Sequence, residues 1–261
     1  KNDERPSVSR QDPDVRVEAF FFNGRCEISL DLCGTPLHRR GYRADGAEAP
    51  LRENRAAALL RFAGYDGTQD VLDPFCGSGT ILIEAALIAR KVAPGLLRDE
   101  NEYKGCRIYD SFKQAVLKCR KEANKNLAHT TNHFIGLDLH ATTLQTARRN
   151  TKSAGVANII EFQEKDAITI KAENLFIVTN PPYGERISEQ TRSIQLLKDL
   201  GFQVKHNCPG TKLAIVVPKG PLETALGFKH SKKMALDNGP IKSSFLRYEI
   251  YAGKKGIKSK E

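Results

Sequence analysis

The stretch Gln69–Arg90 reads QDVLDPFCGSGTILIEAALIAR, and it decides the fold class of this chain. Gln69–Asp73 predicts a short strand, and Ser78–Arg90 is apolar over a length that suits a helix. Gly77 and Gly79 lie in the turn between them, where glycine lets a ligand touch the backbone and the helix start presents unpaired N–H groups. The turn therefore predicts a site for a small polar ligand. A tight strand-to-helix connection without any ligand is the alternative.

This turn differs from the two familiar phosphate-binding patterns. It lacks the G-x-x-x-x-G-K-[ST] pattern of a phosphate loop, and its glycine spacing also departs from G-x-G-x-x-G. The turn is therefore not a phosphate loop.

Strand and helix patterns alternate through most of the chain. Helices are expected at 53–64, 78–90, 111–127, 141–154 and 194–205, and strands at 69–73, 133–138, 159–163, 175–179, 212–217, 227–234 and 245–251. This alternation predicts an α/β fold in which a mostly parallel sheet carries helices on both faces. Ligands of such sheets bind at the carboxyl ends of the strands, where the strand order reverses.

A small β element opens the chain. Residues 15–32 contain two β-rich runs on either side of Asn23-Gly24, a pair that suits a tight hairpin turn. We expect three regions: 1–48 as hairpin and connector, 49–253 as the main domain, and 254–261 as a basic tail. Residues 91–130 read as an elaboration of the main domain.

The composition bounds the partners. Lys and Arg total 41 against 31 Asp and Glu, a net charge of +10, which favours a polyanion such as nucleic acid over a merely solvated surface. The sequence has no apolar run long enough for a membrane span and no secretory signal at its start, so a cytoplasmic location is expected. The six cysteines form no C-x-x-C pair, so no metal site is expected.

Two acidic residues follow predicted strands. Asp138 ends the strand at 133–138, where a carboxylate can accept both hydroxyls of a ribose, and Asp166 follows the next strand, where it could accept an adenine amino group. An acid at such a place, taken singly, is more often a solvated loop residue or a helix cap. Acids at the ends of three successive strands, with Asp73 as the first, favour a shared site.

Asn180-Pro181-Pro182-Tyr183 ends the strand predicted at 175–179. A base amine is a poor nucleophile because its lone pair is delocalised into the ring. If the Asn180 side-chain oxygen and the Pro181 carbonyl each accept one amino hydrogen, the lone pair is held toward a methyl donor. The two prolines restrict the turn, and Tyr183 can stack on a base that has left its helix. A purely structural Pro-Pro turn is the alternative.

The motifs DPFCGSGT, GLD, KDA and NPPYGER, in this order, resemble the class I S-adenosylmethionine-dependent methyltransferases that act on exocyclic amines. The segments SLDLCGTPLHRRGYR, APLRENRAAALL, APGLLR and NPPYGERI are similar to the bacterial 23S rRNA guanine-N2 methyltransferases, whose full-length members carry a THUMP RNA-binding domain. The similarity covers residues 13–239. It implies the catalytic portion of such an enzyme, with 1–48 as the end of a truncated RNA-binding region.

The resemblance implies a Rossmann-like class I methyltransferase fold, with a mostly parallel seven-stranded sheet and a C-terminal antiparallel hairpin. It implies that the S-adenosyl-L-methionine site contains Asp73, Pro74, Cys76, Gly77, Gly79, Thr80, Asp138, Asp166 and Asn180. Asn180, Pro181, Pro182 and Tyr183 are the implied target-amine residues. His140 stands where the family often has a second acid, so Asp138 would hold the ribose without that companion.

We therefore expect methyl transfer to an exocyclic base amine of RNA, guanine N2 of 23S rRNA. The alternatives are a DNA adenine-N6 methyltransferase and a non-catalytic RNA-binding or ribosome-assembly factor. The expected partner is 23S rRNA or a ribosomal precursor, with no membrane, and the chain is expected to be a monomer or weak oligomer. Lys113, Lys118, Arg120 and Lys121 could touch phosphates or merely solvate a helix.

Overall fold

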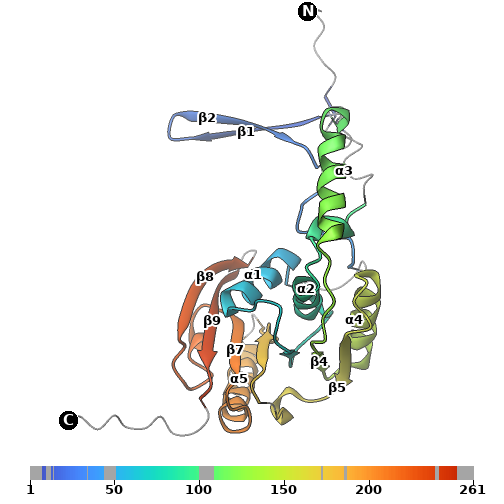
Figure 1. Cartoon of the computed structure of the whole chain (residues 1–261). Helices are drawn as coiled ribbons and strands as arrows, with labels where there is room; N and C mark the ends of the chain where they lie inside the picture. Colours follow the sequence, from blue (N-terminus) through green and yellow to red (C-terminus); the bar gives the residue numbers. More distant parts are fainter. Residues whose placement is uncertain are drawn as a thin grey trace, which may run out of the picture.

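The main body of the protein is one sheet between two layers of helices (Figure 1). The computed structural model describes residues 8–9, 13, 15–33, 35–43, 51–99, 109–171, 173–184, 187–238 and 241–251. The basic tail expected at 254–261 and the boundary expected between residues 48 and 49 lie outside these described residues.

The sheet has seven strands in the order β5-β4-β3-β6-β7-β9-β8. They are β3 (Val71–Asp73), β4 (Phe134–Asp138), β5 (Ile160–Glu164), β6 (Phe176–Thr179), β7 (Lys212–Pro218), β8 (Lys232–Asn238) and β9 (Ile241–Glu249). Strands β3 to β7 pair in parallel, whereas β9 pairs antiparallel with both β7 and β8. The predicted α/β fold, with its mostly parallel sheet and closing antiparallel hairpin, is confirmed.

Helices cover both faces of the sheet. Helices α1 (Glu53–Ala63), α2 (Thr80–Ala89) and α4 (Ala141–Ser153) contribute to one hydrophobic cluster, and α5 (Ile187–Asn207) contributes to the other. Strand β6 serves both clusters, because Phe176 and Val178 belong to the first and Ile177 to the second. Such strands are apolar on both sides, which explains why they read as continuous apolar runs in the sequence.

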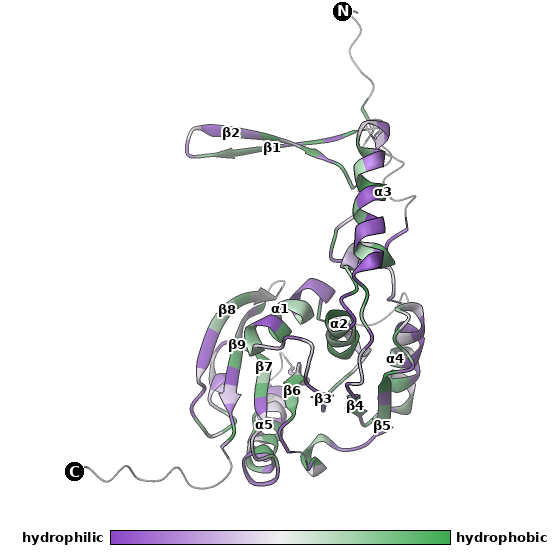
Figure 2. Cartoon of the chain, in the orientation of Figure 1, coloured by the Kyte–Doolittle hydropathy of each residue, from purple (hydrophilic) through white to green (hydrophobic). Residues whose placement is uncertain are grey.

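Helix α2 lies almost entirely in the interior of the main body. Nine of its ten residues are buried, and Figure 2 shows it as mostly hydrophobic. A helix that is buried on nearly every side must be covered by other elements on those sides. The glycine turn that precedes α2 is therefore attached to a fixed support.

The N-terminal hairpin and helix α3 (Tyr109–Lys125) stand away from the sheet (Figure 1). Strands β1 (Arg16–Phe22) and β2 (Arg25–Asp31) pair antiparallel, and the turn residues Asn23 and Gly24 have φ values of 47° and 72°. The predicted hairpin is confirmed. All residues of β1 are exposed, so the hairpin adds nothing to the packing of the main body.

Two predicted elements at the C-terminal end have the wrong bounds. The strand expected at 227–234 begins only at Lys232, since Gly227 has a φ of 78° and is not extended. The strand expected at 245–251 begins already at Ile241, because Ser243 and Ser244 are buried in β9 and interrupt the apolar pattern that marks a core strand. Helix α5 likewise begins before residue 194, in a polar stretch without apolar periodicity.

The connector before α1 is attached to the main body by arginine side chains. Tyr42 is buried within the first hydrophobic cluster, so the core includes residues ahead of position 49. Arg40 forms an ion pair with Glu84 of α2 at 3.2 Å, and Tyr42 donates to the same carboxylate at 3.1 Å. Arg98 donates to the backbone carbonyls of Pro36 and Arg39 at 3.0 and 2.9 Å.

Short 3-10 helices complete the fold, at Pro94–Leu97 (η1), Ala167–Thr169 (η3) and Pro221–Glu223 (η4).

Within the described part of the chain, no helix combines the length and apolar character needed to cross a lipid bilayer.

Candidate active site

The strand order reverses between β3 and β6. The chain goes from β3 to β4 and β5 on one side, and then returns to place β6 on the other side of β3. A sheet of this kind opens a crevice at the carboxyl ends of the two strands that flank the reversal. The glycine turn follows β3 and Asn180 follows β6, so both motifs lie at this crevice.

The glycine turn rests on the end of β4. Its Gly77 N–H donates to the Asp138 carboxylate at 3.2 Å, and the Cys76 N–H donates to the Leu137 carbonyl at 2.9 Å. The other Asp138 oxygen accepts the N–H of His140 at 2.9 Å. A carboxylate offers about four lone-pair positions, so Asp138 keeps acceptor capacity for a further partner.

The two glycines of the turn serve different purposes. Both have positive φ values, 51° at Gly77 and 81° at Gly79, which favour glycine. A Cβ atom at Gly77 would meet nothing within 4 Å, so open space lies beside it. A Cβ at Gly79 would lie 3.2 Å from Phe162 and 3.3 Å from Ala147. Gly77 thus borders open space, whereas the missing side chain of Gly79 makes room for packing.

Asp73 is almost completely enclosed, with 1% of its surface exposed. One of its oxygens accepts the Thr179 hydroxyl at 2.7 Å and the Phe75 N–H at 3.1 Å. Burial raises the pKa of Asp73 to about 7, the hydrogen bonds from Thr179 and Phe75 act in the opposite direction, and the charge of Asp138 adds to the rise. Asp73 thus ties the start of the glycine turn to the end of β6.

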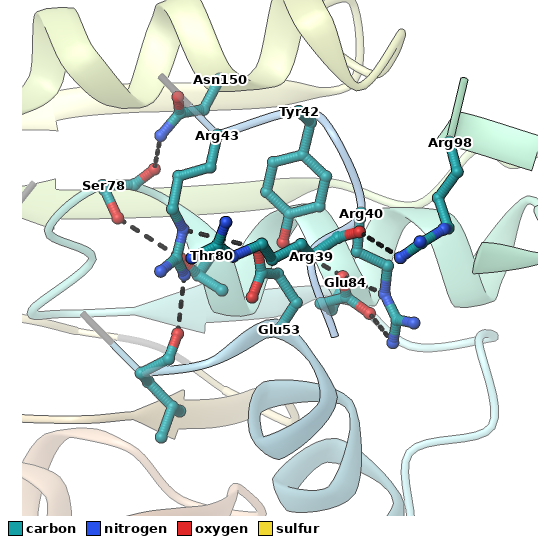
Figure 3. A network of polar contacts seen from close by, with 11 residues as sticks. Arg39, Arg40, Tyr42, Arg43, Glu53, Ser78, Thr80, Glu84, Arg98 and Asn150 are labelled. Atoms are coloured by element: carbon teal, nitrogen blue, oxygen red, sulfur yellow. Dashed lines mark hydrogen bonds and ion pairs between the residues drawn. The ribbon is translucent and has the colours of Figure 1, made fainter. Parts of the chain in front are cut away.

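Two more side chains hold the start of α2 (Figure 3). The buried Asn150 of α4 donates to the Ser78 carbonyl at 2.9 Å. Arg43 of the connector donates to the Thr80 hydroxyl at 2.9 Å and to the Leu51 carbonyl at 2.7 Å. Asn150 lies in none of the quoted motifs, and Arg43 ends the segment SLDLCGTPLHRRGYR without being singled out there as a site residue. Each acts on the turn from a distant part of the chain.

Cys76 cannot act as a nucleophile in this turn. It is 5% exposed, and burial raises the pKa of its thiol far above the ordinary value, with the charges of Asp73 and Asp138 adding to the rise. Only a thiolate attacks effectively. Pro74 and Thr80 are also buried, so they support the turn more than they line its open side.

Asn180 presents a buried acceptor. Its Oδ1 atom is enclosed and finds no hydrogen-bond donor among the described residues. Leaving a buried polar atom unpaired costs about 1–3 kcal/mol, so such an atom in a native fold calls for an explanation. Pro181 beside it is buried, Pro182 is exposed, and Tyr183 is half-buried against the second hydrophobic cluster.

Asp166 lies farther from the turn. It follows β5, which is separated from β3 by β4, and one of its oxygens accepts the N–H of Ile168 at 3.1 Å as the N-cap of η3. The capping role that sequence reasoning offered as the alternative is therefore present. The structure joins Thr179 to Asp73 and Gly77 to Asp138 by hydrogen bonds. Among the described residues, Asp166 forms a hydrogen bond with neither pair.

Sequence reasoning missed Thr179, Asn150 and Arg43. Thr179 ends the apolar run LFIVT, and a hydroxyl at a strand end next to Asn180 is a usable signal. Asn150 is 1% exposed, but its neighbours Arg148 and Arg149 give it the look of a surface position. No group of three or more His, Cys, Asp or Glu residues suited to a metal ion occurs in the part of the chain that the structure describes.

Comparison with known proteins gives one family. The model of the RMKL-like methyltransferase domain matches residues 40–246. The "Ribosomal RNA large subunit methyltransferase K/L" of Shewanella baltica (strain OS195) is 39% identical over 254 residues, which is 95% of this chain and 36% of that relative. The chain thus spans about a third of the length of the curated relatives that it matches.

Solved structures are similar over nearly the whole chain. A possible methylase from Clostridium difficile 630 has a TM-score of 0.83 and 32% identity, and the match covers 97% of this chain and 66% of that one. The SMU.472 protein, solved in complex with SAH (S-adenosylhomocysteine), has a TM-score of 0.79 and 27% identity, with 92% and 63% covered. The site described above therefore lies in a fold shared with these proteins.

Proposed function

The chain belongs to the family of RMKL-like methyltransferase domains, and from this membership we propose that it methylates an exocyclic base amine of RNA, the N2 amine of guanine in 23S rRNA. The methyl donor in this proposal is S-adenosylmethionine. The observation that carries the proposal is the enclosed Asn180 oxygen, for which the described residues supply no donor. It follows β6, the neighbour of the strand β3 that leads into the glycine turn with its open space.

The glycine turn suits S-adenosylmethionine. The open space at Gly77 can take the methionine part, and Asp138 keeps acceptor capacity for the ribose hydroxyls. Asp166 would meet the adenine, with Asp73, Pro74, Cys76, Gly79 and Thr80 shaping the turn. The complex of the similar SMU.472 protein with SAH supports this choice. When bound, the donor supplies an electrophilic methyl group on its sulfonium.

Asn180 would hold the amine that is methylated. Its free oxygen can accept one amino hydrogen, and the carbonyl of Pro181 can accept the second. Both acceptors draw the amine into the geometry in which its lone pair faces the methyl donor, and this placement contributes most of the rate. Tyr183 would stack on the target base. The amine nitrogen attacks the methyl group directly, so the step requires no covalent intermediate. The amine's proton leaves to solvent after the attack, so the step requires no general base.

Charge supports a nucleic acid as substrate. The chain carries a net charge of +10, and Lys113, Lys118 and Lys121 are exposed on α3, where they can meet phosphates. Arg120, in contrast, donates to the Gly95 carbonyl at 2.7 Å, so it supports the fold of this region. The name of the Shewanella relative supports ribosomal RNA of the large subunit as the substrate. We place the activity in the cytoplasm, in a monomer or weak oligomer.

Mass spectrometry of digested nucleosides tests the proposal. The chain is incubated with methyl-labelled S-adenosylmethionine and either unmodified 23S rRNA or duplex DNA. Labelled N2-methylguanosine from the RNA is expected. Labelled N6-methyladenine from the DNA would instead support an adenine methyltransferase, and failure to bind S-adenosylmethionine in calorimetry would support a non-catalytic RNA-binding or assembly factor.

A further inference from the structure

We propose that Thr179 is a positioning residue, whose hydroxyl holds Asn180 at a fixed place relative to the glycine turn by anchoring on Asp73. The inference rests on the proposed function, because it assumes that Asn180 grips the amine. It adds a residue outside the Asn-Pro-Pro-Tyr motif to the machinery that aligns the two substrates.

The backbone does not join β3 to β6 at the level of the site. The paired residues of these strands are Val71 with Phe176 and Leu72 with Ile177, and the ladder ends there. Thr179 lies two residues farther along β6, beside the crevice. The hydrogen bond from the Thr179 hydroxyl to Asp73, at 2.7 Å, therefore links β6 to β3 beyond their last paired backbone residues.

The other side of β6 is held by its backbone. Val178 pairs with Ala214 and Thr179 pairs with Ile215 of β7. Without the hydroxyl contact, the end of β6 would be fixed to β7 alone, and the side toward the glycine turn would depend on packing. The donor-binding turn and the amine-binding residue would then no longer share a direct link.

The Thr179 contact is enclosed and shares its acceptor with the turn itself. Thr179 is 0% exposed and Asp73 is 1% exposed, so water does not compete for the hydrogen bond. The same Asp73 oxygen accepts the Phe75 N–H at 3.1 Å, within the turn. One carboxylate oxygen thus sets the position of both the turn and the residue next to Asn180.

Misplacement of reacting groups by about 1 Å can lower a rate on the order of a hundredfold, so loss of this link should be visible in turnover. The matched variants are Thr179→Val, which keeps the shape without the hydroxyl, and Thr179→Ser, which keeps the hydroxyl. We expect Thr179→Val to lower kcat by about tenfold or more, with the Kd for S-adenosylmethionine within about threefold. Thr179→Ser should recover most of the loss. A kcat within about twofold of wild type for a folded Thr179→Val would overturn the proposal.

A double-mutant cycle tests whether Asp73 is the anchor. If Thr179 acts through Asp73, then Asp73→Ala combined with Thr179→Val should lower kcat no more than Asp73→Ala does alone. Losses that multiply would show that the two residues act independently and would overturn the assignment. Thermal unfolding of each variant verifies that it is folded.

A second readout does not need activity. The side-chain amide of Asn180 gives nitrogen-15 NMR signals, which can be assigned by their loss in Asn180→Ala. We expect these signals to shift in Thr179→Val and to return in Thr179→Ser. Unchanged signals would overturn the positioning role. A wild-type chain that forms no N2-methylguanosine would contradict the proposed function, and the amide signals would still decide the role of Thr179.

Discussion

The Asp138 carboxylate accepts the backbone N–H of Gly77 at 3.2 Å, across 61 positions of the chain. The residue proposed to hold the ribose therefore also fixes the turn proposed to hold the methionine part. Its other oxygen accepts the N–H of His140 at 2.9 Å. One side chain thus couples the two halves of the donor site, and changes at Asp138 should affect both.

Asp138→Ala should weaken donor binding. The variant removes the ribose acceptor and leaves the Gly77 N–H without its partner, so we expect the Kd for S-adenosylmethionine to rise by about tenfold or more. Isothermal titration calorimetry measures the change. Glu164→Ala is the matched control, since Glu164 is an exposed acid at the end of the neighbouring strand β5. Equal affinity of both variants would contradict the role of Asp138.

Asn180→Ala should remove activity while donor binding persists. Loss of the free acceptor leaves the amine unaligned, and we expect kcat to fall by about a hundredfold or more, as when one transition-state hydrogen bond is removed. Radiolabelled methyl transfer to RNA gives kcat, and calorimetry gives the Kd. Asn158→Ala is the control, because Asn158 is exposed and lies before β5, at the amino end of this edge strand, whereas Asn180 follows the carboxyl end of β6. Full turnover by Asn180→Ala would exclude the assigned role.

Alanine substitutions at the two glycines of the turn should have different effects, because Gly77 borders open space and Gly79 borders packed side chains. Gly79→Ala should destabilise the fold by about 1–3 kcal/mol, because its Cβ would crowd Phe162 and Ala147 at a positive φ. Gly77→Ala should cost less stability and weaken donor binding more, because its Cβ would enter open space. Urea unfolding and calorimetry measure the two effects. The reverse pattern would contradict the ligand space assigned to Gly77.

The raised pKa of Asp73 predicts a pH-dependent stability. Burial raises the pKa of Asp73 in the folded protein to about 7, well above the ordinary value of an aspartate carboxyl group. The resulting stabilisation is complete below the unfolded pKa and is lost as the pH rises through about 7. Between pH 8 and pH 5, wild type should gain on the order of 2 kcal/mol relative to Asp73→Asn, which does not titrate. Urea unfolding at several pH values measures the difference, and parallel curves would contradict it.

The ion pair between Arg40 and Glu84 should contribute far more to the free energy of unfolding than a surface pair does. Its side chains are 11% and 4% exposed, so Glu84→Ala leaves a nearly buried Arg40 uncompensated and should cost about 3–5 kcal/mol. The control is Glu249→Ala, which breaks the more exposed pair with Arg247 and should cost less than about 1 kcal/mol. Chemical unfolding measures both. Similar costs would show that the connector is not held by this contact.

Much of the fold could be predicted because its signals are local. The apolar run before Asp73, the glycine turn and the apolar helix that follows are contiguous in the chain, and so is the Asn23-Gly24 hairpin. The bounds of β9 could not be predicted in this way. Ser243 and Ser244 are buried there by contacts with other strands, and neighbouring residues in the sequence do not reveal such contacts.

The candidate site shows the same difference between local signals and contacts between distant residues. By itself, the sequence determined the order of strands and helices and the identity of the two motifs, because turn geometry and periodicity depend on adjacent residues. Only the tertiary structure decided that Thr179 meets Asp73 across 106 positions, that Asp73 is enclosed, and that the Asn180 oxygen meets no donor within the described part of the chain. Burial and hydrogen bonding between such distant residues arise when the strands are laid side by side, and no local pattern encodes them.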